Sequence, residues 1–175
     1  MPFGMLCYRR MGGSKIMLDI NTPRGQETLI HEKEAVEIFH RWWGKTYTYQ
    51  PTDKSKPIAF DAYLMQGENR RAIVETKCRS DMDYRDFVTQ RHNLWLITED
   101  KLERCAKIAG TLNIPLYGFL YFVKCRTLLV IRLSEKNGRL LPHKSIKTKT
   151  TATINGGQLS RLNAFIDMTH ARKMI

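Results

Sequence analysis

Two acids and a lysine lie in two short apolar segments that have the composition of neighbouring strands. Asp61 interrupts the apolar segment 58–65, and Glu75-Thr76-Lys77 ends the segment 72–78. Because residues two apart on a strand point to the same face, Glu75 and Lys77 are expected to project together. Turn-forming residues at 66–69 predict that the two segments form a hairpin. A hairpin would bring Asp61 beside the other two side chains.

Two carboxylates and an ammonium group on one face have the chemistry to hydrolyse a phosphodiester. Hard divalent ions such as Mg²⁺ prefer oxygen ligands, which makes Asp61 and Glu75 candidate metal ligands. A metal there would polarise the phosphoryl oxygen and lower the pKa of a bound water. Lys77 would orient that water or stabilise charge developing on the phosphate. The alternative is an ordinary surface ion pair, because this loose spacing often arises by chance.

A third candidate acid lies in the segment 28–44, whose amphipathic pattern predicts a helix ending at Gly44. On a helical wheel Glu32 falls within an apolar face, while Glu34 and Glu37 fall on the opposite side. The apolar face consists of Leu29, Ala35, Val36, Phe39 and Trp43. An acid on such a face is costly unless it is paired or bound to metal, so Glu32 is predicted to complete the site. The alternative is that Glu32 still reaches solvent near the start of the helix.

The order of a helical Glu, a strand Asp and a strand ExK motif resembles the PD-(D/E)xK nuclease superfamily, over about residues 25–133. In its Holliday junction resolvase-like branch, apolar residues follow the helical Glu at three, four and seven places, and then a glycine. The matching residues after Glu32 are Ala35, Val36, Phe39 and Gly44. The resemblance implies that Glu32, Asp61 and Glu75 bind metal and that Lys77 is the catalytic lysine. Phe60 stands where the motif has proline.

The resemblance implies a restriction-endonuclease-like fold and a Mg²⁺-dependent deoxyribonuclease, with Mn²⁺ able to substitute. An endonuclease is favoured over an exonuclease. Structure-selective cleavage of the junction-resolvase kind, a homodimer and a phage or mobile-element origin are the more specific expectations. Some branches add a polar residue from a later helix, so Gln90 and Lys101 are accessory candidates, with ordinary polar roles as the alternative. The rival function is a nucleic-acid-binding module that keeps the fold without catalysis.

The other elements predict a single α/β or α+β domain, in which helices flank a mixed sheet of about five strands. Residues 80–93 are predicted to be partly helical, Thr98 to cap a helix over 99–113, and Asn137-Gly138 to form a turn. A further short helix is expected within 158–175. Strand patterns occupy 45–50, 94–97, 115–123 and 126–133. The core would therefore span about 25–133, followed by a basic extension over 134–175.

The basic residues are concentrated in the second part of the chain, whose overall net charge is +12. Residues 1–100 hold 15 Lys and Arg against 14 Asp and Glu, whereas residues 101–175 hold 14 against 3. Because phosphate neutralisation releases counterions, this asymmetry predicts a polyanionic partner, here DNA. Lys144, Lys147 and Lys149 are expected to line one face of an extended segment, and Arg79 to contact phosphate. A solvated basic face without a partner is the alternative.

Several other classes are disfavoured by the sequence. The four cysteines are widely separated and lack CxxC spacing, which argues against a disulfide framework or a zinc site. No histidine pair has metal-ligand spacing, and no P-loop is present. No apolar run approaches the ~18 residues needed to span a bilayer, and no secretory signal is recognisable. The sequence thus predicts a cytoplasmic protein, in the host cytoplasm if phage-encoded, with no membrane partner.

Overall fold

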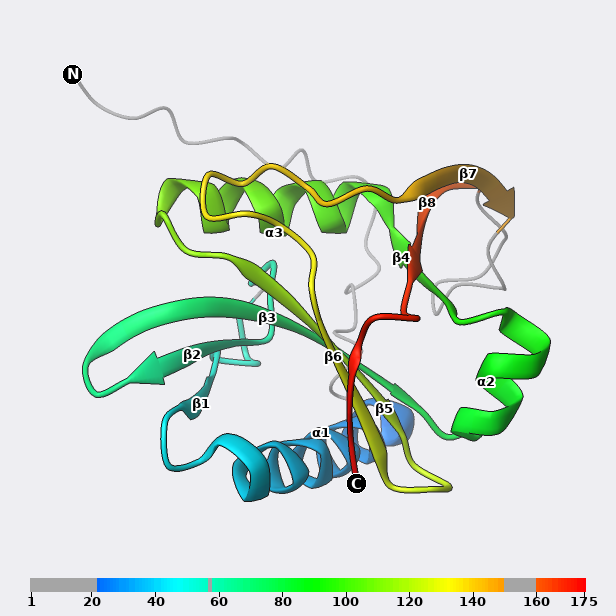
Figure 1. Cartoon of the computed structure of the whole chain (residues 1–175), viewed down its shortest axis with the longest axis horizontal. Helices are drawn as coiled ribbons and strands as arrows, with labels where there is room; N and C mark the ends of the chain where they lie inside the picture. Colours follow the sequence, from blue (N-terminus) through cyan, green and yellow to red (C-terminus); the bar gives the residue numbers. More distant parts are fainter. Residues whose placement is uncertain (1–21, 57, 150–159) are drawn as a thin grey trace, which may run out of the picture.

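The computed structural model describes residues 22–56, 58–149 and 160–175, which form three helices and nine strands (Figure 1). The helices are α1 (Pro23–Trp43), α2 (Tyr84–Arg91) and α3 (Glu99–Thr111). The first five strands are β1 (Thr48–Pro51), β2 (Ala62–Gln66), β3 (Asn69–Arg79), β4 (Leu94–Thr98) and β5 (Leu116–Phe122). The others are β6 (Thr127–Arg132), β7 (Lys144–Lys149), β8 (Ser160–Asp167) and β9 (Arg172–Met174). None of the described helices is long and apolar enough to cross a membrane.

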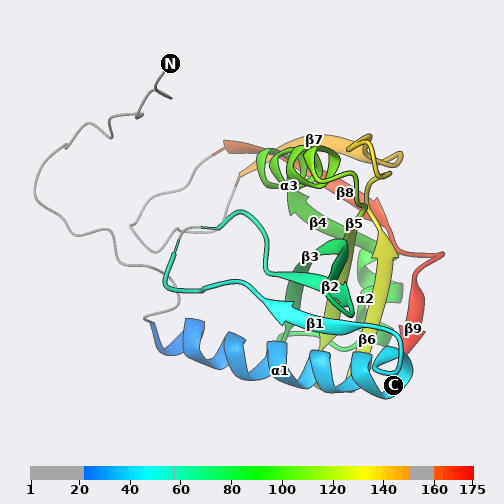
Figure 2. The same cartoon turned by 90° about the vertical axis from the view of Figure 1, so that its left-hand side faces the viewer.

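A six-stranded mixed sheet of order β1-β2-β3-β5-β6-β9 forms the middle layer. Its strands pair antiparallel except β3 and β5, which are parallel and are connected through α2, β4 and α3. A second sheet has the order β4-β8-β7. Helix α1 covers one face of the large sheet, and α3 lies with the small sheet on the other side (Figure 2). The α/β class is confirmed, with one more strand in the main sheet than expected and a second sheet that was not expected.

Each face of the large sheet carries its own hydrophobic core, because successive residues of β3 point to opposite sides. Ile73 packs in the core beneath α3 and the small sheet, whereas Val74 packs in the core beneath α1. The alternation continues through the motif, so Glu75 and Lys77 share the α3 face while Thr76 lies on the α1 face. The predicted projection of Glu75 and Lys77 to one side is confirmed.

Helix α1 starts earlier than the apolar pattern suggests. Thr22 caps it by accepting a hydrogen bond from the Gly25 N–H (3.0 Å), and Pro23 occupies the first turn, where its missing N–H costs nothing. Ala35 and Phe39 are buried as predicted, and Ile38 joins them. Glu37 is exposed as predicted.

The prediction that Glu34 points to solvent is wrong. The Glu34 Oε2 atom accepts a hydrogen bond of 3.0 Å from the hydroxyl of Tyr121 on β5, and Glu34 is half-buried. The wheel placed Glu34 opposite the apolar face, but the tyrosine is long enough to reach the flank of the helix. The Tyr121 hydroxyl therefore gives Glu34 a hydrogen-bond partner while the acid stays only half-buried.

The short helix expected within 158–175 is also wrong, since its described residues form β8 and β9 and the first two lie outside the described part. Ala164, Ile166 and Met168 are buried in one core, and this spacing of two is the period of a strand, not of a helix. Strand β8 pairs with β4 and β7, and β9 forms an edge of the large sheet. The carboxy-terminal residues thus form strands of both sheets and not an appended tail.

Candidate active site

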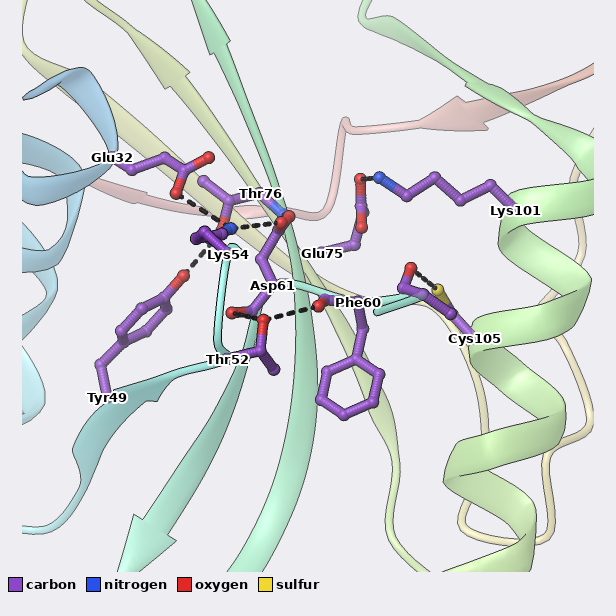
Figure 3. Close-up of polar contacts among 11 residues, drawn as sticks. Glu32, Tyr49, Thr52, Lys54, Phe60, Asp61, Glu75, Thr76, Lys101 and Cys105 are labelled. Carbon is purple, nitrogen blue, oxygen red and sulfur yellow. Dashed lines mark hydrogen bonds and ion pairs between the residues drawn. The ribbon is translucent and has the colours of Figure 1, made fainter. Parts of the chain in front are cut away.

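The candidate site lies at an edge of β3, where its pairing with β2 ends. The last pair of the ladder is Ala62 with Val74, and Asp61 precedes β2 instead of interrupting it. Asp61 donates its N–H to the Val74 carbonyl (2.9 Å), and its Oδ2 accepts the Thr76 N–H (2.8 Å). The Asp61 carboxylate thereby accepts the Thr76 N–H, as the backbone carbonyl of a further strand residue would. Side chains from both faces of the sheet can meet around this edge (Figure 3).

Glu75 lies on the α3 side of the edge and is only 7% exposed. Its Oε1 forms an ion pair with the Lys101 ammonium of α3, while its Oε2 is buried without a hydrogen-bond partner. Burial, reinforced by repulsion from Asp61 and opposed by Lys101, raises the pKa of Glu75 to about 8. Burial opposes the charge of Lys101, but attraction to Glu75 and Asp61 outweighs it and raises the pKa of that lysine. Glu75 Oε2 therefore lacks a hydrogen-bond partner, and the negative charge of this side chain is poorly stabilised.

Glu32 approaches the same edge from α1. The Lys54 ammonium lies between it and Asp61, 3.2 Å from Glu32 Oε2 and 2.7 Å from Asp61 Oδ1. Burial and the nearby Asp61 raise the pKa of Glu32 despite this pairing. Burial disfavours the charged form of Lys54, yet attraction to both acids gives a net rise in its pKa. The predicted proximity of Glu32 to Asp61 is confirmed, and the pKa values of Glu32 and Glu75 are raised first by burial and then by repulsion from Asp61.

The structure brings most of the predicted residues together. Lys77 is exposed on the face of Glu75, and Arg79 is half-buried two residues further along β3 on the same face. Lys101, an accessory candidate, contacts Glu75 directly. Gln90 is exposed on α2 and donates a hydrogen bond to Asp86 (3.2 Å), without a described contact to the cluster.

Lys54 is the residue of this cluster that the sequence did not suggest. It lies in the linker segment 52–56 that follows β1, where no periodic pattern places side chains. The only feature of the sequence that could have indicated Lys54 is its place seven residues before Asp61, a candidate metal ligand. The approach of Lys54 depends on how the linker folds back over Asp61, which is set by the Thr52 N–H and hydroxyl donating to the Asp61 carbonyl (2.8 and 3.0 Å).

The prediction that the three lysines of β7 share one face is wrong. Lys147 and Lys149 alternate and lie on one side, whereas Lys144 lies on the other, because 144 and 147 are an odd number of residues apart on a regular strand. All three are exposed. Strand β7 is fixed to α3 through Glu99, which accepts hydrogen bonds from Ser145 Oγ (2.8 Å) and His143 Nε2 (2.9 Å).

The cluster has the oxygen ligands that a hard divalent ion prefers. Glu32, Asp61 and Glu75 supply them, and the unpartnered, buried Glu75 Oε2 is the atom that most needs a cation. In the described residues, no three acids, histidines or cysteines are gathered closely enough to enclose a metal as they stand. Lys54 and Lys101 contact these same carboxylates, so the acids fit a metal once an ammonium group moves aside.

Cys78, Cys105 and Cys125 are free thiols, and Cys7 lies outside the described residues. Cys105 is close to the cluster and donates to the Ala59 carbonyl (3.1 Å), and burial raises its pKa to about 12. A thiol with such a pKa stays protonated near neutral pH and is a poor nucleophile. The described cysteines thus act as packing groups.

Comparison of the chain with protein-family models, with curated proteins and with solved structures finds no match.

Glu32→Gln is expected to lower Mn²⁺ affinity by at least about 10-fold, because even the loss of an outer-shell partner typically costs a metal site ~10- to 100-fold in affinity. Thermal stability in metal-free buffer should stay unchanged or rise, because a partly buried acid with a raised pKa becomes neutral. Titration calorimetry and thermal melts would measure both. Glu37→Gln, an exposed position on the same helix, is the matched control. Unaltered metal affinity in Glu32→Gln would remove this residue from the ligand set.

Proposed function

We propose that the protein is a metal-dependent nuclease that hydrolyses DNA phosphodiester bonds at the edge of β3. The observation that carries the proposal is the buried, unpartnered Glu75 Oε2, adjacent to Asp61 and on the same face as Lys77. Burying an acid without a partner is costly, and structural ion pairs do not usually leave one oxygen unsatisfied. A cation bound during catalysis would satisfy this oxygen.

Each residue of the site has a role that follows from its contacts. A divalent ion held by Glu32, Asp61 and Glu75 would supply Lewis acidity and an activated water. The Thr76 N–H orients Asp61, and Lys101 positions Glu75. Lys77 faces solvent beside Glu75, where it is placed to contact the substrate phosphate. Arg79, on the same face, would bind a neighbouring phosphate.

The mixed sheet with α1 on one face and α3 on the other supports a restriction-endonuclease-like core as the more specific fold. The edge site also supports the PD-(D/E)xK assignment, because Glu32 of α1, Asp61 just before β2 and Glu75 of β3 meet there in the order that the resemblance requires. Structure-selective cleavage by a homodimer remains the more specific proposal, and it depends on the helix pattern after Glu32 alone.

The decisive experiment is a panel of labelled linear, nicked, flap and four-way DNA substrates, incubated with Mg²⁺, Mn²⁺ or EDTA. We expect cleavage with either metal and none in EDTA. Asp61→Asn is the matched inactive variant, because an asparagine oxygen can still accept the Thr76 N–H that Asp61 holds. Cleavage that persists in EDTA or in this variant would contradict the proposal. DNA binding without cleavage of any substrate would favour a non-catalytic binding module.

Neutralising two lysines of β7, with Lys147→Gln and Lys149→Gln combined, is expected to weaken DNA binding and make its salt dependence shallower. The slope of log K against log salt should fall by about one for each lost phosphate contact on duplex DNA. Lys144→Gln, on the opposite face of the strand, provides the comparison. Fluorescence anisotropy at several salt concentrations would measure the slopes. An unchanged slope in the double variant would indicate that the DNA-binding surface lies instead around Arg79, Arg126 or Arg132.

A further inference from the structure

We propose that Lys54 is a built-in cation that occupies the place of a metal ion between Glu32 and Asp61, and that divalent-metal binding displaces it. The inference rests on the proposed function, because it concerns how the same site takes up its metal. It adds a step that the sequence did not suggest: Lys54, with residues 53–56, would have to move away from the two acids before the metal is fully coordinated.

The ammonium group bridges carboxylates from two separate elements. Glu32 comes from α1 and Asp61 from the start of β2, and one nitrogen contacts both, at 3.2 and 2.7 Å. The side chains of Glu32 and Asp61 are only 16% and 17% exposed, so water screens their mutual repulsion poorly. A cation is therefore needed between them, and Lys54 supplies it from the chain itself (Figure 3).

A metal and Lys54 would compete for the same oxygens. Asp61 already holds the Thr76 N–H with Oδ2, and Lys54 contacts Oδ1. A divalent ion beside Asp61 would also repel an ammonium group at this distance. Glu75 Oε2, by contrast, has no partner that would be displaced. The metal is thus expected to gain Glu75 Oε2 without displacing an ammonium group, and to gain Asp61 and Glu32 only by expelling Lys54.

The linker can release Lys54 without unfolding the strands. Its base is held by Thr52, which donates through its N–H and hydroxyl to the Asp61 carbonyl. Beyond Thr52, the contacts of Asp53 are local, to Ser55 (2.6 Å) and Lys56 (3.3 Å). The Lys54 side chain is 26% exposed, and residues 53–56 make no other described hydrogen bond to the strands, so this short segment can move outward together with Lys54. The ion pairs of Lys54 with Glu32 and Asp61 are therefore the contacts that a metal would break.

Lys54→Met, which keeps the length of the side chain and removes its charge, tests the displacement directly. Mn²⁺ affinity would be measured by titration calorimetry without DNA, at pH 8.5, so that protons compete little for the acids. We expect Lys54→Met to bind Mn²⁺ at least about tenfold more tightly than the parent, because no ammonium must be expelled. Lys56→Met, a change in the same linker at an exposed lysine, should match the parent. Equal or weaker Mn²⁺ binding by Lys54→Met would overturn the inference.

Hydrogen exchange on the unaltered chain provides a second test that does not require a variant to fold. Mn²⁺ should increase exchange in residues 53–56 while leaving β3 protected, and unchanged or slower exchange in the linker would contradict displacement. Cleavage by the parent protein distinguishes the two proposals. Metal-dependent cleavage without tighter binding in Lys54→Met would overturn only the role of Lys54. The absence of both Mn²⁺ binding and cleavage would overturn the proposed nuclease as well.

Discussion

Glu75→Gln is expected to abolish metal-dependent cleavage while leaving the folded protein at least as stable as the parent near pH 8. The change removes an anionic ligand at the centre of the cluster, and metal-ion catalysis contributes several kcal/mol to such reactions. A loss of that size corresponds to about a thousandfold or more in rate. Single-turnover cleavage of the best substrate of the panel, at saturating Mg²⁺, would measure it.

The same variant should flatten the dependence of stability on pH. The folded pKa of Glu75 is about 8, above its ordinary value of 4.5, so the folded state holds a proton that the unfolded state has lost between these two values. The free energy of unfolding of the parent should therefore decline as pH rises from about 4.5 to 8. Glutamine cannot ionise, so this component should be absent in Glu75→Gln. Thermal melts from pH 5 to 9 in EDTA would show the difference.

Glu37→Gln is the control for both measurements, because Glu37 is an exposed acid on the outer side of α1. It should leave the cleavage rate and the pH profile unaltered, within the ~0.5 kcal/mol typical of surface changes. Full cleavage by Glu75→Gln would show that the metal binds elsewhere. A pH profile identical to that of the parent would show that Glu75 is not the acid that takes up the proton.

The parts of the fold that depend on local pattern were predictable from the sequence. The hairpin of β2 and β3 turns at the expected residues, with Gln66 paired to Asn69, although an irregularity between Leu64 and Met65 shifts the register by one residue before the strands reach the site. Alternation then places Glu75 and Lys77 on one face. The amphipathic pattern of α1 likewise placed Glu32 towards the sheet, since burial of one helix face is also a local signal.

The rest of the site depends on long-range packing that no local pattern specifies. Lys101 reaches Glu75 only because α3 crosses over β3 after the strand β4 has joined a different sheet. Lys54 reaches its acids through an irregular linker. Strand β8 pairs with β7, which directly precedes it in the chain, but its other neighbour, β4, comes from a distant part of the chain. The polar partner of Glu34 is similarly remote, on β5.

Trp95 illustrates how such packing shapes the site. Gly118 of β5 pairs with Glu75 of β3, and a Cβ atom added at Gly118 would overlap the indole ring of Trp95. The glycine therefore lets the buried ring of β4 lie against the sheet beside the catalytic candidate. This apolar surrounding contributes to the burial that raises the pKa of Glu75. The sequence shows a glycine within an apolar strand but not which side chain fills its space.

Lys77→Met is expected to lower the cleavage rate by ~10²- to 10³-fold, the cost of removing one group that stabilises developing charge, without lowering Mn²⁺ affinity. The reason is its position: Lys77 is exposed on the face of Glu75, whereas the proposed metal ligands are the three acids. Single-turnover rates at saturating metal, together with calorimetric Mn²⁺ titrations, would separate the two effects.

Two further lysine variants decide whether the effect belongs to Lys77. Lys107→Met changes an exposed lysine of α3 and should retain the parental rate. Lys101→Met removes the partner of Glu75 Oε1, a contact that positions a ligand and does not reach the substrate. If Lys101→Met caused the large rate loss and Lys77→Met caused none, the stabilising ammonium would be that of α3. The ExK lysine would then be a surface residue, and Lys101 of α3 would have to stabilise the charge developing on the phosphate.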